Sequence, residues 1–212
     1  MLINEIFKSI SGESIQAGRP AVFIRTFSCP LRCKWCDSLY AVEGDDYKEM
    51  SVSEIVDEVI QLNCNYIVLT GGESLIQHDV MDLIYHLIDI GCHVEIETSG
   101  AVDIDEVVRL DNVTVTMDWK CSSSGMIDKM SPERLYKLRA KDVVKCVVGS
   151  LQDLEEMHSL LDHTAAQIFV SPVFGMIEPK DIVEYILNNN LNTVRFQLQL
   201  HKYVWPSDMR GV

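Results

Sequence analysis

Short runs of apolar, β-branched and aromatic residues recur along the chain, and longer amphipathic stretches separate them. Runs of this length and composition are typical of β-strands. Most of them are continuously apolar, which indicates strands that are covered on both faces. We expect strands at residues 21–27, 66–70, 93–97, 113–118, 142–148, 167–172 and 193–200.

The stretches between these strands carry helix signals. Ser51 and Glu54 form a capping box before the segment "IVDEVIQL". Ser150 and Asp153 open the segment "LQDLEEMHSLL", and Gly91 closes "VMDLIYHLIDI". The alternation of strands and helices predicts a parallel sheet that is covered by helices.

The number of strand–helix units limits the choice of fold. A complete eight-fold β/α barrel usually takes about 250 residues, whereas this chain has 212. A doubly wound sheet is the alternative, but no G-x-G-x-x-G motif follows the first expected strand. The sequence shows no internal repeat, low-complexity tract or linker. We therefore predict a single α/β domain over residues 1–212, an incomplete, open β/α barrel of about six βα units.

Polar segments follow five of the expected strands. In parallel α/β folds the carboxyl ends of the strands form the rim of the active site. Because these segments share that end of the sheet, we expect them to build one site. They are "CPLRCKWCDS", "TGGES", "ETSG", "DWKCSSSG" and "SPVFG".

The composition excludes several classes of protein. A formal net charge of −14 argues against a nucleic-acid groove, which needs a basic face. No apolar run approaches the ~20 residues of a membrane helix, and the first residues lack a signal-peptide pattern. We therefore expect a cytoplasmic protein. Seven cysteines, an odd number, argue against a disulfide framework. Cys64, Cys92, Cys121 and Cys146 are expected to be small buried hydrophobic residues.

The other three cysteines, Cys29, Cys33 and Cys36, form a C-x3-C-x2-C motif after the first expected strand. A structural zinc site needs four ligands, and no second cysteine or histidine pair is present, so a distant fourth ligand would be required. A redox pair would leave the third thiol without a role. A [4Fe–4S] cluster with three thiolate ligands keeps one iron open for another molecule.

Two motifs resemble those of the radical S-adenosylmethionine (SAM) enzymes. One is the cysteine motif with an aromatic residue, Trp35, before its last cysteine, and the other is "TGGE" at residues 70–73. The resemblance implies a [4Fe–4S] cluster whose open iron binds the amino and carboxylate groups of SAM. It also implies that an electron from the cluster cleaves SAM to a 5′-deoxyadenosyl radical.

The rest of the chain resembles the 7-carboxy-7-deazaguanine synthase family. The segments that carry this resemblance are "EIFKSISGESIQAGRPAVFIRTFSCPLRCKWCDS", "VLTGGESLIQ", "VEIETSG", "SSSGM" and "LQLHKYVWPSDMRGV". The family converts 6-carboxy-5,6,7,8-tetrahydropterin to 7-carboxy-7-deazaguanine with release of ammonia, on the route to queuosine. The resemblance implies that Mg²⁺ assists the ring contraction, that the protein is a homodimer, and that a reductase such as flavodoxin or ferredoxin supplies electrons.

The resemblance also assigns roles to individual residues. The cluster ligands are Cys29, Cys33 and Cys36, and the Mg²⁺ ligand is Ser38. The implied SAM contacts are Trp35, Asp37, Gly72, Glu73, Glu97, Asp118, Lys120 and Ser171. The implied contacts with the pterin substrate are Ile10, Ser11, Gly12, Glu13, Arg25, Thr70, His201 and the terminal carboxylate of Val212.

Structural alternatives remain for several of these residues. Ser38 could cap a helix, and Arg25 could pair with an internal carboxylate instead of the substrate. His201 could make a merely structural hydrogen bond, and Glu97 could lie in a surface turn. The sequence also departs from the family at Ser11, where glutamine is usual, so the substrate edge needs another partner such as a bridging water.

Two other functions are compatible with the cysteine motif. A radical SAM activase of a glycyl-radical enzyme shares the motif, but it leaves "HKYVWPSDMRGV" without a role. A non-catalytic metal-binding module would need a fourth ligand and has no use for "TGGE" or "ETSG".

Overall fold

The computed structural model describes residues 1–207 and 209–212. Within them the chain forms one mixed sheet in the order β3-β1-β2-β4-β5-β6-β7-β8-β9. The strands are β1 (Leu2–Ile10), β2 (Pro20–Thr26), β3 (Lys48–Glu49), β4 (Tyr66–Gly71), β5 (His93–Thr98), β6 (Val113–Trp119), β7 (Val143–Val148), β8 (Gln167–Pro172) and β9 (Arg195–Phe196). The helices are α1 (Val52–Leu62), α2 (Val80–Asp89), α3 (Pro132–Leu135), α4 (Leu151–Ser159), α5 (Pro179–Asn188) and α6 (His201–Val204).

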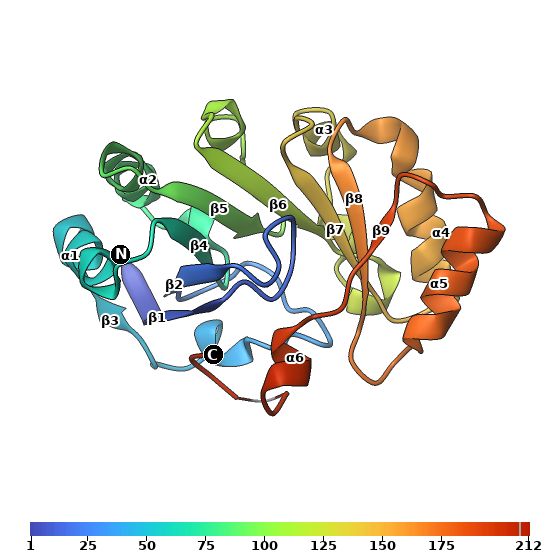
Figure 1. Cartoon of the computed structure of the whole chain (residues 1–212), viewed down its shortest axis with the longest axis horizontal. Helices are drawn as coiled ribbons and strands as arrows, with labels where there is room; N and C mark the ends of the chain where they lie inside the picture. Colours follow the sequence, from blue (N-terminus) through green and yellow to red (C-terminus); the bar gives the residue numbers. More distant parts are fainter. Residues whose placement is uncertain (208) are drawn as a thin grey trace.

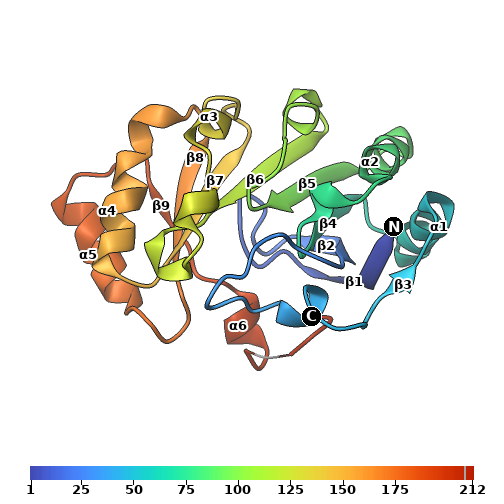
Figure 2. The same ribbon diagram turned by 180° about the vertical axis from the view of Figure 1, so that it is seen from behind.

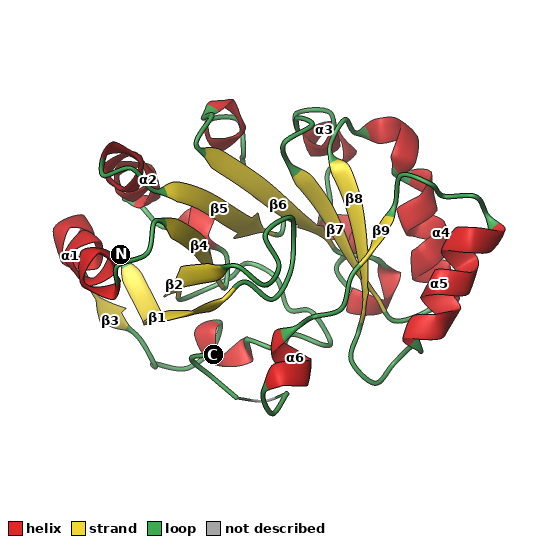
Figure 3. Cartoon of the chain, viewed as in Figure 1, coloured by secondary structure: helices red, strands yellow, loops and turns green. Residues whose placement is uncertain are grey.

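The sheet is curved and open. Strands β2 and β4 to β9 run parallel, β1 is antiparallel to β2, and β3 is antiparallel to β1. The longer helices lie along the outer side of the curve, and α6 lies on the opposite side (Figure 1). The reverse view in Figure 2 shows the same arrangement, and Figure 3 separates the strands from the helices around them. No described helix is long and apolar enough to cross a lipid bilayer.

Two expectations about strands were wrong. The segment Leu2–Ile10 is a strand that the sequence analysis missed, so the cysteine loop follows the second strand, and Arg25 lies on β2. At the other end, the strand expected at 193–200 is only Arg195–Phe196. Directly after this strand, the Gln197 side chain binds the backbone N–H and carbonyl of Ser14, at 2.6 and 2.9 Å, which ties the segment to the loop after β1.

The strands place different residues on the two faces of the sheet, because successive side chains of a strand point to opposite sides. Residues such as Ile24, Leu69 and Ile96 are fully buried in the apolar core that includes the helices. Every second residue instead points to the inner, concave side, and there polar residues such as Thr70 and Glu97 gather. The alternation within each strand therefore separates the core from the site.

The expected helix signals are present. Ser51 and Glu54 make both hydrogen bonds of a capping box at the start of α1. Ser150 accepts a hydrogen bond from the Asp153 N–H at the start of α4. Gly91 follows α2 with a φ of +85°, a conformation that favours glycine.

Candidate active site

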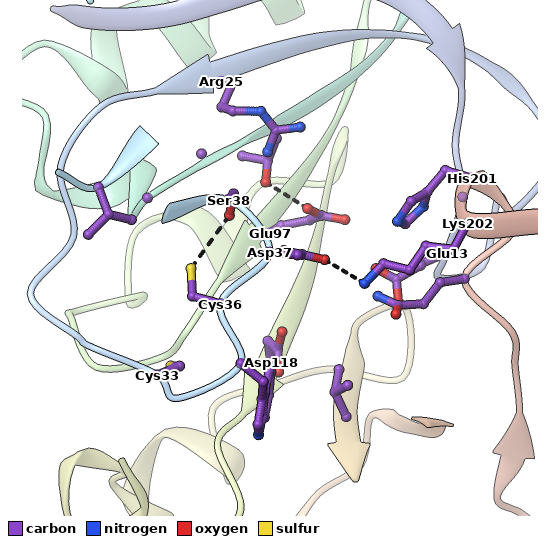
Figure 4. A pocket seen from close by; sticks show the side chains of 18 of the residues that line it. Glu13, Arg25, Cys33, Cys36, Asp37, Ser38, Glu97, Asp118, His201 and Lys202 are labelled. Atoms are coloured by element: carbon purple, nitrogen blue, oxygen red, sulfur yellow. Dashed lines mark hydrogen bonds and ion pairs between the residues drawn. The ribbon is translucent and has the colours of Figure 1, made fainter. Parts of the chain in front are cut away.

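One cavity on the concave side of the sheet collects most of the predicted site residues. Its wall comes from the carboxyl ends of the strands, the loops that follow them and the C-terminal segment (Figure 4). The predicted residues in this wall are Ile10, Gly12, Glu13, Arg25, Cys29, Cys33, Trp35, Cys36, Asp37, Ser38, Thr70, Gly72, Glu97, Asp118, Lys120, His201 and Val212.

The three cysteines of the motif are free, half-buried and in the cavity wall. Their three sulfur atoms do not all lie within 4.8 Å of one another. They are therefore too far apart for one metal ion, whereas a cluster binds each thiolate through a different iron. Burial raises the pKa of Cys29 and Cys33, although Lys120 opposes this, so bound metal is what would keep these thiols deprotonated.

The two glycines of "TGGE" allow the end of β4 to approach the cysteine loop. A Cβ on Gly71 would lie 2.2 Å from the Thr26 carbonyl oxygen, and one on Gly72 would lie 2.1 Å from that of Ser28. The Gly72 N–H donates to Thr26 and the Glu73 N–H donates to Ser28, at 3.1 and 2.8 Å. The glycine pair thus fixes the start of the loop that carries the cysteines.

Glu73 differs from its expected role as a SAM contact. Its side chain is fully buried and is not part of the cavity wall. Its carboxylate accepts hydrogen bonds from Thr98 Oγ1 (2.8 Å), the Ser99 N–H (2.8 Å) and Ser99 Oγ (2.6 Å). The carboxylate of "TGGE" therefore ties the end of β4 to the end of β5.

Ser11 and Ser171, two more of the predicted contacts, also lie outside the cavity wall. The Ser11 hydroxyl donates to the Glu13 carbonyl at 3.0 Å, so it shapes the loop after β1. Ser171 lies on β8 with no exposed surface, and its Oγ has no hydrogen-bond partner among the described residues. The structure does not bring either side chain to the cavity.

One side of the cavity, next to the cysteine loop, carries Trp35, Asp118 and Lys120. The Lys120 ammonium lies 5.3 Å from the centre of the Trp35 ring and 2.9 Å from Asp118 Oδ2. The other carboxylate oxygen, Asp118 Oδ1, is buried and has no partner among the described residues. An oxygen in this state is an acceptor for a ligand with N–H or O–H groups.

Asp37 is engaged within the protein. Its Oδ2 lies 3.0 Å from the Nζ of Lys202 on α6 (Figure 4). Desolvation acts to raise the pKa of Asp37, but the charge of Lys202 outweighs it and lowers that pKa below its ordinary value. The pair connects the cysteine loop to the C-terminal segment.

The opposite side of the cavity carries the predicted substrate residues. Arg25 Nε binds Glu5 Oε1 at 2.8 Å, so the internal partner considered for this arginine exists, yet Arg25 also lines the cavity. Thr70 Oγ1 donates to Glu97 Oε2 at 2.7 Å. His201 packs on Gly12, since a Cβ there would lie 2.3 Å from His201 Nδ1. Burial lowers the pKa of His201, which favours the neutral ring at pH 7.

The last residues of the chain return to this side of the cavity. Arg210 lies 3.8 Å from the centre of the Tyr40 ring and pairs with Asp46 at 2.8 Å. These contacts hold the segment beside the cavity, and Val212 lines its wall.

Lys145 and Lys202 also line the cavity, and neither was predicted from the sequence. Lys145 interrupts the apolar run "VVKCVV" of β7. A lysine in the middle of a buried strand is the signal that could have found it, because buried charges need partners. Lys202 carried no comparable signal, because its partner Asp37 lies far away in the sequence.

Ser38 lines the cavity and precedes the short turn Leu39–Ala41, where its side chain makes no capping hydrogen bond. Its Oγ lies 3.9 Å from Cys36 Sγ (Figure 4). The structure therefore does not show the cap that was the alternative to an Mg²⁺ ligand, and the hydroxyl remains a candidate for that role.

We expect Ser38→Ala to raise the Mg²⁺ concentration for half-maximal turnover several-fold, because Mg²⁺ prefers oxygen ligands. Iron content should not change. The measurement is an Mg²⁺ titration beside Ser159→Ala, which removes a hydroxyl on α4 outside the cavity. Identical titrations for the two variants would remove Ser38 from the metal site.

A scan of protein families supports the class that this site suggests. Residues 23–144 match the family described as the Radical SAM superfamily. The match spans more than half of the chain, so the chain belongs to the radical SAM superfamily.

Full-length relatives narrow this assignment. A 7-carboxy-7-deazaguanine synthase from Clostridium acetobutylicum is 38% identical over 98% of this chain and 97% of its own. One from Methanospirillum hungatei is 40% identical over 96% of this chain and 85% of its own. The crystal structure of QueE from Escherichia coli matches with a TM-score of 0.77 and 25% identity, over 94% of each chain. The chain is a member of the 7-carboxy-7-deazaguanine synthase family, and the predicted family and fold class are confirmed.

Proposed function

We propose that the protein converts 6-carboxy-5,6,7,8-tetrahydropterin to 7-carboxy-7-deazaguanine with release of ammonia. The observation that carries the proposal is one cavity whose wall holds the three cysteines together with Glu13, Arg25 and His201. The names of the full-length relatives supply the product, and the family resemblance of the sequence supplies the substrate and the release of ammonia.

The donor set fits the groups that the superfamily uses. Cys29, Cys33 and Cys36 would hold a [4Fe–4S] cluster, and the unpaired oxygen of Asp118 would accept a hydrogen bond from SAM. When bound, the cluster and SAM would supply the radical chemistry that abstraction of a hydrogen atom from the substrate needs.

The other side of the cavity suits a carboxylated pterin. The free Oε1 of Glu13 is buried and would accept from the amino or ring N–H groups of a pterin. Arg25 keeps only its Nε on Glu5, so the rest of its guanidinium can bind the substrate carboxylate. His201, held neutral by burial, can exchange a hydrogen bond with the pterin ring. The terminal carboxylate of Val212 is a further proposed contact.

The remaining partners are part of the proposal. Mg²⁺ at Ser38, a flavodoxin- or ferredoxin-like electron donor and a homodimer stay predictions that follow from the family. The activase alternative is not favoured, because the relatives named as deazaguanine synthases match nearly the whole chain.

An anaerobic turnover assay tests the proposal. Reconstituted protein with SAM, dithionite, Mg²⁺ and 6-carboxy-5,6,7,8-tetrahydropterin should yield 7-carboxy-7-deazaguanine and ammonia. Protein that holds its cluster and cleaves SAM but leaves the pterin unchanged would contradict the proposed substrate.

Arg25→Gln should raise KM for the pterin roughly ten- to hundredfold, because a charge-assisted hydrogen bond is worth about 1.5–3 kcal/mol. Uncoupled cleavage of SAM should be retained. Arg134→Gln is the matched control, since Arg134 is a half-buried arginine outside the cavity that donates to Gly100. If both variants keep the wild-type KM, Arg25 pairs with Glu5 and does not bind the substrate carboxylate.

A further inference from the structure

Lys145 lies inside the open barrel, and only 7% of its side chain is exposed. Its Nζ is 2.9 Å from Glu13 Oε2 and 3.5 Å from Asp118 Oδ2. Glu13 belongs to the loop after β1, whereas Asp118 lies on β6. The ammonium therefore joins two carboxylates that are far apart in the sequence.

Each of these carboxylates turns one oxygen to Lys145 and keeps the other free, and Asp118 Oδ2 also lies 2.9 Å from the ammonium of Lys120. Glu13 Oε1 and Asp118 Oδ1 are both buried and have no hydrogen-bond partner among the described residues. Both residues line the cavity, Glu13 on the side proposed for the pterin and Asp118 on the side proposed for SAM. Buried acceptors without a partner are rare unless a ligand completes them.

Lys145 is protonated in this environment. Burial acts to lower the pKa of Lys145, but Glu13 and Asp118 outweigh it and raise that pKa well above its ordinary value. Lys145 is therefore a cation at neutral pH, and it orients the carboxylate of Glu13 directly and that of Asp118 together with Lys120.

We propose that Lys145 is a positioning residue that aims the free oxygen of Glu13 at the substrate and that of Asp118 at SAM. This inference rests on the proposed function. Lys145 acts through the two carboxylates, so its loss should weaken the binding of both ligands.

The test is calorimetric titration of the anaerobic, cluster-loaded protein without reductant, with SAM and with 6-carboxy-5,6,7,8-tetrahydropterin in separate experiments. Lys145→Met should weaken the binding of each ligand at least tenfold. Lys145→Arg restores the cation and should bring both affinities back to within about fivefold of the wild type. In turnover, Lys145→Met should raise KM by a larger factor than it lowers kcat.

Lys141→Met is the matched control, because Lys141 also pairs with a buried carboxylate, Asp142 at 3.3 Å, but lies outside the cavity. Iron content and melting temperature show whether each variant folds. If Lys145→Met does not fold, Lys145→Gln replaces it, and the loss in affinity should have the same sign.

Unchanged affinities in a folded neutral variant overturn the proposal, and so does an arginine variant as weak as the neutral one. Wild-type protein that does not bind the pterin contradicts the proposed function instead. In that case the affinities of the Lys145 variants for SAM alone test the role of Lys145, because Asp118 is the proposed SAM contact.

Discussion

Replacing Cys29, Cys33 or Cys36 by alanine is expected to remove the cluster and all measurable turnover together. Each thiolate would bind a different iron, so the loss of one thiol removes one of the three protein ligands of the cluster. Iron content and the visible absorbance of the reconstituted protein report the loss directly.

The other cysteines provide the controls for this experiment. Cys92 is buried in the apolar core, and Cys64 lies at the opposite end of β4 from the cavity. Cys92→Ala and Cys64→Ala should retain the iron content and SAM cleavage of the wild type. Loss of the cluster in either of these variants, or its survival in a variant of the motif, would refute the three-thiol site.

The sequence predicted the parallel part of the fold because its strands are strongly apolar runs between clear helix signals. Strand β1 escaped because "LINEIFKSI" mixes polar and apolar residues, and because it pairs antiparallel with β2 on one side and with the two-residue strand β3 on the other. A half-polar strand of this kind has no distinct signature, since its pairing is determined by partners elsewhere in the chain. The position of the site could be predicted because polar residues that follow buried parallel strands share one end of the sheet.

The direction of individual side chains could not be predicted in the same way. Ser11 and Ser171 lie close to the cavity along the chain, but a strand alternates its faces, and a tight loop turns a hydroxyl towards its own backbone. Lys145 was overlooked because its apolar neighbours indicate a strand that is buried in the core. Only the register of β7 beside β6 shows that Lys145 faces Asp118.

Glu73→Ala is expected to destabilise the protein by about 3–5 kcal/mol, because it leaves buried donors of Thr98 and Ser99 without their acceptor. For a chain of this size, each kcal/mol corresponds to roughly 2–4 °C in melting temperature. The variant should therefore melt roughly 6–20 °C below the wild type in anaerobic thermal unfolding. Glu73→Gln keeps the shape but brings an NH₂ group to the same donors, so it should also lose stability.

The matched control is Glu106→Ala, which removes an exposed carboxylate that accepts one hydrogen bond from Tyr85 and should change stability by less than about 0.5 kcal/mol. The affinity for SAM separates the two roles considered for Glu73. If its carboxylate ties β4 to β5, the folded fraction of Glu73→Gln should bind SAM within a few-fold of the wild type, because the side chain does not reach the cavity. A variant with the wild-type melting temperature and greatly weakened SAM binding would instead make Glu73 a direct contact of the cofactor.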